Sequence, residues 1–146
     1  MRCALWDLYP EELQKVGLQS AIEHLVRDIA AGNGLRVQLS FNGAAQRLPM
    51  DVEKGLLRIS QEALSNAVKH AHAREVRIEL FFDSQRARLS VKDDGQGFQV
   101  KLRPGTFGLT SMQDRTRALG GVWTIQSDPG CGTEIHASIP IPPAVN

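Results

Sequence analysis

Residues 58–71 read RISQEALSNAVKHA, and this stretch has the spacing of an amphipathic helix with a reactive polar face. Glu62 and Asn66 are four residues apart, so they share one face of a helix, and Lys69 and His70 extend that face by another turn. The opposite face is apolar at helical spacing, which predicts packing on a core. Its members are Leu56, Ile59, Ala63, Leu64, Ala67 and Val68.

The polar face offers oxygen ligands and a candidate base. Magnesium prefers hard oxygen ligands and keeps several waters, and the side-chain carbonyl of Asn66 is a suitable neutral ligand. Glu62 is placed to orient or deprotonate an attacking group, or to hold a metal-bound water. A helix face that is merely solvated has the same pattern, so E-x-x-x-N alone does not decide between the two interpretations.

Residues 91–98, VKDDGQGF, form an acidic turn directly after a predicted strand at residues 86–91. Gly95 and Gly97 permit backbone angles and close approaches that a side chain would block. A carboxylate in this turn can accept a hydrogen bond from the exocyclic amine of adenine, whereas guanine presents a carbonyl there. An ordinary hairpin turn is the alternative, because Asp-Gly is a common turn pair.

Four segments occur in an order and at spacings that resemble one family. They are RISQEALSNAVKHA, VKDDGQGF, PGTFGLTSMQDRTRALGG and GCGTEIHASIP. The series resembles the ATP-binding catalytic domain of bacterial sensor histidine kinases, within the gyrase, chaperone, histidine kinase and mismatch-repair ATPase superfamily. Residues 5–22 are similar to the linker and first helix of the nitrate/nitrite-sensor subfamily. The resemblance covers nearly the whole chain.

The resemblance implies a binding site for ATP and Mg²⁺. Asn66 matches a magnesium ligand, and Glu62 matches the acidic residue that acts as base toward the accepting histidine. Asp93 matches the adenine-binding carboxylate, and Thr133 matches the threonine that completes the adenine site. The other matches shape the base pocket or approach the phosphates, and they are Lys69, His70, Gly95, Gly97, Gly108 and Leu109. We therefore expect Glu62, Asn66 and Asp93 to line one cavity.

The resemblance also implies an activity: transfer of the γ-phosphate of ATP to a histidine on a separate dimerisation domain. The further partner would be a response regulator with a helix-turn-helix output domain. No phosphoacceptor histidine box occurs in this sequence, and His24 lacks that context. We expect a monomeric domain that needs its partner for transfer. Two alternatives stay open: a stand-alone anti-sigma-factor-type serine kinase of the same fold, and a non-catalytic nucleotide-binding interaction domain.

Two further segments bear on the site. The family often has M-x-E-R after its second glycine box, and here residues 112–115 read MQDR. We expect the shorter carboxylate of Asp114 to weaken a local salt bridge outside the chemistry. Residues 98–107 are the expected lid, whose Lys101 and Arg103 either approach the triphosphate or only keep the loop soluble.

Length and composition fit one compact globular domain. The chain has 146 residues, of which 42% are hydrophobic and 23% charged. A net charge of +1 with 5% aromatic residues gives no case for nucleic-acid binding. Cys3 and Cys131 match no metal-binding spacing. No apolar run could span a membrane and no signal peptide is evident, so we expect a cytoplasmic domain without membrane contact, cut from a longer protein that could itself be membrane-anchored.

The pattern predicts an α+β fold: a two-layer α/β sandwich of the Bergerat type, with a mixed sheet covered on one face by helices. We expect a linker from the dimerisation helices at residues 1–9, the ATP-binding domain at 10–140 and a frayed tail at 141–146. Helices are expected at residues 10–31, 51–71 and 108–119, and strands at 37–41, 75–82, 86–91, 122–127 and 133–139. Asp51 is a plausible helix cap, and Gly55 either permits close packing or has no role.

Overall fold

The computed structural model describes residues 17–30, 32, 34–42, 49–69, 73–83, 85–96, 109–128 and 130–141. Several expectations fall outside these ranges and are not tested by the structure. They concern the linker at 1–9, the lid at 98–107 with Lys101 and Arg103, the tail beyond 141, and the site residues His70, Gly97 and Gly108.

The described strands form one five-stranded mixed sheet in the order β1-β2-β3-β5-β4. The strands are β1 (Arg36–Asn42), β2 (Glu75–Phe82), β3 (Arg86–Asp93), β4 (Val122–Ser127) and β5 (Thr133–Pro140). β1 and β2 are parallel, whereas every other neighbouring pair is antiparallel. All five predicted strands are therefore confirmed, each with ends that differ by no more than a residue or two.

Asp83, the first residue of the turn between β2 and β3, stabilises this hairpin. The carboxylate of Asp83 accepts hydrogen bonds from the backbone N–H groups of Gln85 and Arg86, each at 2.7 Å. These bonds lower the pKa of Asp83. The turn between β2 and β3 is thus stabilised by the aspartate at its start.

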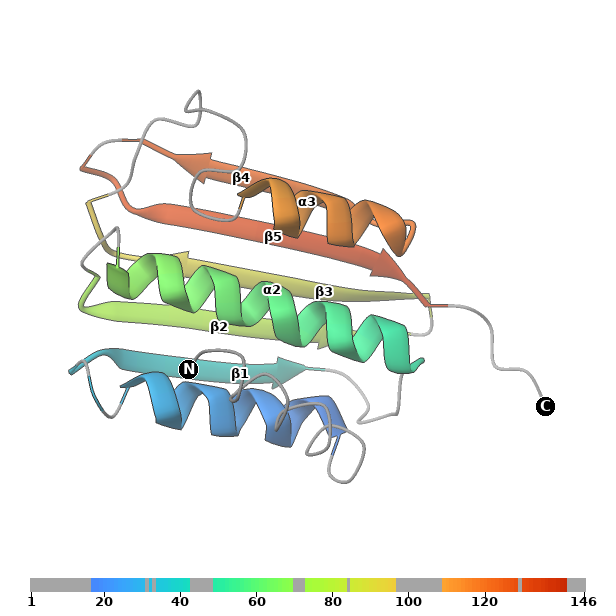
Figure 1. Ribbon diagram of the computed structural model, residues 1–146, viewed down its shortest axis with the longest axis horizontal. Helices are drawn as coiled ribbons and strands as arrows, with labels where there is room; N and C mark the ends of the chain where they lie inside the picture. The colour runs from blue at the N-terminus through green and yellow to red at the C-terminus, as the bar shows by residue number, and fades with distance from the viewer. Residues whose placement is uncertain are drawn as a thin grey trace.

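Helices α2 (Met50–Lys69) and α3 (Leu109–Ala118), together with a helix whose described part is residues 17–30, lie on one face of the sheet (Figure 1). The strands alternate in burial accordingly, as in β3, where Leu89 is buried and Arg88 is exposed. The predicted two-layer architecture is confirmed. Among the described residues, no helix has the length and apolar character needed to cross a bilayer.

The core lies between the helices and the sheet. The predicted apolar face of α2 is buried apart from Val68, which is half-buried, and Leu56, Ile59 and Leu64 are fully enclosed. The first helix contributes Leu18, Ile22 and Leu25 to the buried core. Ile29 of the same helix is partly buried against that core.

Two predictions about α2 can be compared with the structure. A Cβ on Gly55 would lie only 2.5 Å from Cδ1 of Leu119, so this glycine permits close contact between α2 and the residue that follows α3. Asp51 lies inside the helix, which begins at Met50. Its carboxylate still accepts a hydrogen bond from the Val52 N–H at 3.0 Å, an amide of the first turn that also donates to the carbonyl of Pro49.

Candidate functional site

The ends of β3 and β5 bring two predicted site residues together. Asp93 is the last residue of β3 and Thr133 is the first residue of β5, and the two are paired in the strand register. Both side chains are buried, with exposed fractions of 8% and 6%. The sheet therefore places a carboxylate beside a hydroxyl where β3 ends and β5 begins.

The Asp93 carboxyl is held in a partly desolvated position. Burial raises the pKa of Asp93, and the nearby negative charge of Asp94 adds to this effect. Hydrogen bonds from the backbone N–H groups of Gly95 and Thr133 act in the opposite direction, and the Gly95 bond measures 2.9 Å. A buried carboxylate of this kind has acceptor capacity beyond its backbone partners, so a ligand amine is a suitable donor.

The turn between β4 and β5 lies directly against the turn that follows Asp93. Gly132 has a φ of +78°, and a Cβ there would collide with the backbone carbonyl oxygen of Asp93. The Gly130 N–H donates a hydrogen bond to the carbonyl of Gln96. Only glycine combines this backbone angle with this close approach at position 132, which explains the second glycine of the G-C-G-T segment.

A hollow of about 240 Å³ lies at the ends of β3, β4 and β5. Pockets for drug-sized ligands typically measure roughly 300–1,000 Å³, so this one can enclose part of a nucleotide rather than all of it. Its lining comes from the turn between β4 and β5 and from the ends of the three strands next to it. The lining residues are Lys92, Asp93, Gln126, Ser127, Asp128, Cys131, Gly132, Thr133 and Glu134.

Ser127 is a site residue that sequence reasoning missed. Its hydroxyl lies 2.8 Å from the Thr133 hydroxyl and 3.2 Å from the carbonyl oxygen of Gly132. When Ser127 donates to that carbonyl, it accepts from Thr133, and the Thr133 oxygen keeps lone pairs for a ligand or a water. Ser127 ends β4 in register with Thr133, a relationship that becomes visible only once the two strands are paired.

The second aspartate of the DDGQG turn has a structural role that was not predicted. Oδ1 of Asp94 accepts hydrogen bonds from the backbone N–H groups of Arg74 and Glu75, at 2.9 and 3.0 Å. These bonds lower the pKa of Asp94. The side chain thereby ties the end of β3 to the start of β2, beside the site.

The remaining described site residues lie on the helices. Glu62 and Asn66 are half-buried on α2, and Lys69 is exposed at its last residue. α2 and β3 end on the same side of the molecule (Figure 1). The described lining of the hollow does not include Glu62 or Asn66, so the cavity expected to join them to Asp93 stays a prediction. Leu109 begins α3, as expected for a residue at a helix start.

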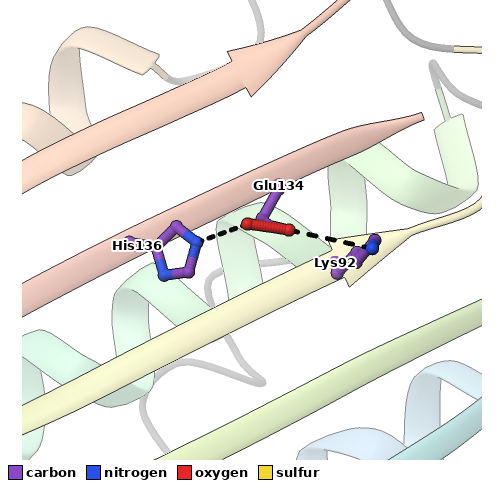
Figure 2. Close-up of polar contacts among 3 residues, drawn as sticks. All are labelled: Lys92, Glu134 and His136. Carbon is purple, nitrogen blue, oxygen red and sulfur yellow. Dashed lines mark hydrogen bonds and ion pairs between the residues drawn. The ribbon is translucent and has the colours of Figure 1, made fainter. Parts of the chain in front are cut away.

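Three polar side chains, Lys92, Glu134 and His136, lie on the face of the sheet away from the helices, near the same strand ends (Figure 2). Oε1 of Glu134 lies 2.6 Å from Nε2 of His136, and Oε2 lies 3.9 Å from Nζ of Lys92. The hydrogen bond with His136 is the main cause that lowers the pKa of Glu134. Exposed pairs of this kind contribute little stability. Lys92 and Glu134 also belong to the lining of the hollow.

One family model matches the part of the chain that holds the predicted site residues. The family described as histidine kinase-, DNA gyrase B-, and HSP90-like ATPase matches residues 51–143. This range contains α2 except for Met50, the DDGQG turn and the G-C-G-T segment. It therefore includes every predicted site residue.

Two curated relatives are sensor kinases. The chain is 34% identical over 142 residues to the signal transduction histidine-protein kinase/phosphatase DegS of Brevibacillus brevis, covering 97% of the chain and 37% of DegS. It is 33% identical over 144 residues to the sensor histidine kinase LiaS of Bacillus subtilis (strain 168), covering 98% of the chain and 39% of LiaS. The chain thus spans about two fifths of these relatives. They refine the narrower resemblance toward DegS- and LiaS-type kinases, which are not strictly nitrate sensors.

Solved structures share the fold. The blue-light activated histidine kinase of Erythrobacter litoralis EL346 superposes with a TM-score of 0.68 at 20% identity, covering 85% of this chain and 42% of that one. At this identity the likeness concerns the fold alone. It agrees with the mixed sheet and one-sided helical layer described above.

Proposed function

Because the chain belongs to the histidine kinase-, DNA gyrase B- and HSP90-like ATPase family, we propose that it supports γ-phosphate transfer from ATP to a histidine on a separate dimerisation domain. Its relatives are sensor histidine kinases of two-component signalling, and the family binds ATP. The observation that carries the proposal is the buried Asp93 carboxyl, paired with Thr133 at a hollow closed by Gly132.

Asp93 and Thr133 would hold the adenine base. The Asp93 carboxylate accepts from the exocyclic amine, and its two backbone partners fix its orientation. Thr133 completes the contact directly or through a water, with its hydroxyl oriented by Ser127. Gly95 and Gly97 shape the base pocket. The triphosphate is assigned to the end of α2 and the start of α3, through Lys69, His70, Gly108 and Leu109, where backbone amides at a helix start can face phosphate.

The donor set on α2 fits Mg²⁺. Among the described residues, no group of three or more His, Cys, Asp or Glu side chains is arranged to hold a metal ion. Magnesium does not require such a cage, because it is commonly bound through one or two protein oxygens together with waters and substrate phosphates. The half-buried Asn66 carbonyl can supply such an oxygen. When bound, the ion would neutralise charge on the phosphate oxygens.

Glu62 would act as the base toward the incoming histidine. It lies one turn before Asn66 on the same face of α2, so the metal ligand and the base are held by one rigid element. The residues of this chain would mainly position the reactants and neutralise charge, as is general in phosphoryl transfer.

The proposal extends to the organisation of the whole kinase. Residues 1–9 would link the dimerisation helices to the ATP-binding domain at 10–140, with a frayed tail at 141–146. The partners would be the dimerisation domain and a response regulator with a helix-turn-helix output domain. The ATP-binding domain would act in the cytoplasm as a monomer, with neither nucleic-acid nor membrane contact.

The decisive experiment mixes the chain with the dimerisation domain of its kinase and γ-labelled ATP. We expect an acid-labile, base-stable phosphohistidine on the dimerisation domain, lost with Asp93→Ala. Acid-stable phosphate on a serine would instead favour the serine kinase alternative. Nucleotide binding without any phosphoryl transfer to an active partner would favour the non-catalytic interaction domain.

A further inference from the structure

Arg115 of α3 lies against the helix that carries the proposed base. A Cβ on Gly55 would be 3.8 Å from Cγ of Arg115, so the aliphatic stem of Arg115 passes over Gly55 on α2. Gly55 and Glu62 fall on the same face of α2, because residues i and i+7 align after about two turns. The helices lie side by side on the sheet (Figure 1), and this contact directs a cation toward the stripe that holds Glu62.

The environment of the Arg115 guanidinium disfavours its positive charge. Arg115 is half-buried, and its Nε is buried without a hydrogen-bond partner among the described residues. Burial is the main cause that lowers the pKa of Arg115, and the like charge of Arg58 adds to it. The negative charge of Glu62 acts in the opposite direction. A partly buried cation requires a compensating anion, and Glu62 is the carboxylate whose charge acts on it in this way.

Arg58, Arg115 and Glu62 form one group of interacting charges where α2 and α3 pack together. Arg58 lies one turn earlier on α2, and Arg115 approaches from α3. A glutamate has three side-chain torsions, and a base must be ionised and held in a narrow range of positions to be effective. A guanidinium is suited to this task, because its planar donors match the geometry of a carboxylate.

We propose that Arg115 is a positioning residue that holds the ionised Glu62 carboxylate in its working orientation from across the helix pair. The inference rests on the proposed role of Glu62 as base. It also changes the interpretation of the MQDR segment, where the exposed Asp114 marks the departure from the family pattern while the neighbouring Arg115 packs against α2.

A double-mutant cycle tests the proposal, using Arg115→Gln, Glu62→Gln and the double variant in the chain mixed with its dimerisation domain. The readouts are the initial rate of phosphohistidine formation at saturating ATP and the affinity for Mg-ATP. We expect Arg115→Gln to lower the rate roughly tenfold, within the range of couplings between residues that share one network of charges. The affinity should change by less than about twofold, since Arg115 does not line the described hollow. In the Glu62→Gln background, Arg115→Gln should have no further effect.

Two further variants separate charge from packing. Arg115→Lys keeps the stem and the charge, so it should retain more of the rate than Arg115→Gln, even if the glutamine variant is unstable. Arg117→Gln removes an exposed arginine two residues along α3 and should leave the rate unchanged.

Three results would overturn the inference. They are an unchanged rate in Arg115→Gln, an equal loss in the Glu62→Gln background, and an equal loss in the lysine variant. If Glu62→Gln keeps the full rate, the proposed base itself is wrong, and the inference fails with it. Loss of activity in Glu62→Gln without coupling to Arg115 would overturn the inference alone.

Discussion

The adjacent carboxylates of Asp93 and Asp94 are bound to different partners. Asp93 is buried beside Thr133 at the hollow. Asp94 is exposed, and it accepts hydrogen bonds from the backbone N–H groups of Arg74 and Glu75. One aspartate is available to a ligand, and the other fastens the start of β2. The DDGQG turn therefore combines a recognition group and a structural group in consecutive positions.

This division predicts different defects from matched substitutions. Asp93→Ala should abolish ATP binding even where the variant is fully folded, because the lost group is the partner of the base. Asp94→Ala should retain most of the affinity but lower the free energy of unfolding by about 1 kcal/mol, since its hydrogen bonds are exposed. Calorimetric titration and thermal melting measure both effects. Unchanged affinity in Asp93→Ala would refute the assignment of the base site.

The raised pKa of Asp93 predicts a pH dependence of base binding. The ionised carboxylate is the better acceptor, so the affinity should fall as the pH drops through this pKa. The fall should begin at a higher pH than for an aspartate with the ordinary pKa of 3.8. Adenosine is a suitable probe because it has no phosphate to titrate. Asp93→Asn cannot ionise and should bind weakly with a much flatter profile. An equally steep profile in this variant would assign the titration to another group.

The two aspartates should also affect folding stability in opposite directions. Because the pKa of Asp93 is raised, its contribution is fully present below pH 3.8 and is lost as the pH rises through the folded-state pKa. The pKa of Asp94 is lowered, so its contribution is present above pH 3.8 and is lost as the pH falls through its folded-state pKa. Denaturant titrations of Asp94→Asn at several pH values should therefore show weaker acid destabilisation than the wild type.

Gly132→Ala should damage the site more than the fold. The new Cβ would collide with the carbonyl oxygen of Asp93, so the turn must move away from β3. The backbone at position 132 also has a φ of +78°. Gly130→Ala is a matched control, because its φ is +83° but no atom lies within 4 Å of the added carbon. Both variants carry roughly 1–2 kcal/mol of backbone strain. Only Gly132→Ala should lose ATP affinity, and equal losses would mean that close packing against Asp93 is unimportant.

Sequence patterns were sufficient for the elements but not for their ends. The period of α2 predicted a helix at 51–71, yet the helix begins at Met50 because the carbonyl of Pro49 accepts hydrogen bonds from Val52 and Glu53, each at 3.0 Å. Alternation predicted β3 and β5 separately. Such local signals depend on a residue and its near neighbours in the chain, which is why they identify elements well and boundaries less well.

The site depended on relationships that no local pattern contains. The roles of Asp93 and Thr133 came from a family resemblance, and the pairing of β3 with β5 then placed the two side by side. Ser127 and the bonding of Asp94 were missed, because each depends on which strand lies next to it. The two interpretations of Gly55 could be separated only by the position of Leu119 on the neighbouring segment.

Asn66→Ala should weaken nucleotide binding mainly when magnesium is present. The substitution removes a neutral oxygen from the polar face of α2 and leaves the base site at Asp93 intact, so metal-free ATP should bind almost as well as before. With Mg²⁺ we expect roughly tenfold weaker binding, about 1.4 kcal/mol. Ser65→Ala, at the neighbouring half-buried position, controls for the substitution on α2 and should leave both affinities unchanged. Titrations of ATP with Mg²⁺ and with a chelator measure the difference. An equal loss under both conditions would mean that Asn66 contacts the nucleotide or supports the helix without ligating the metal.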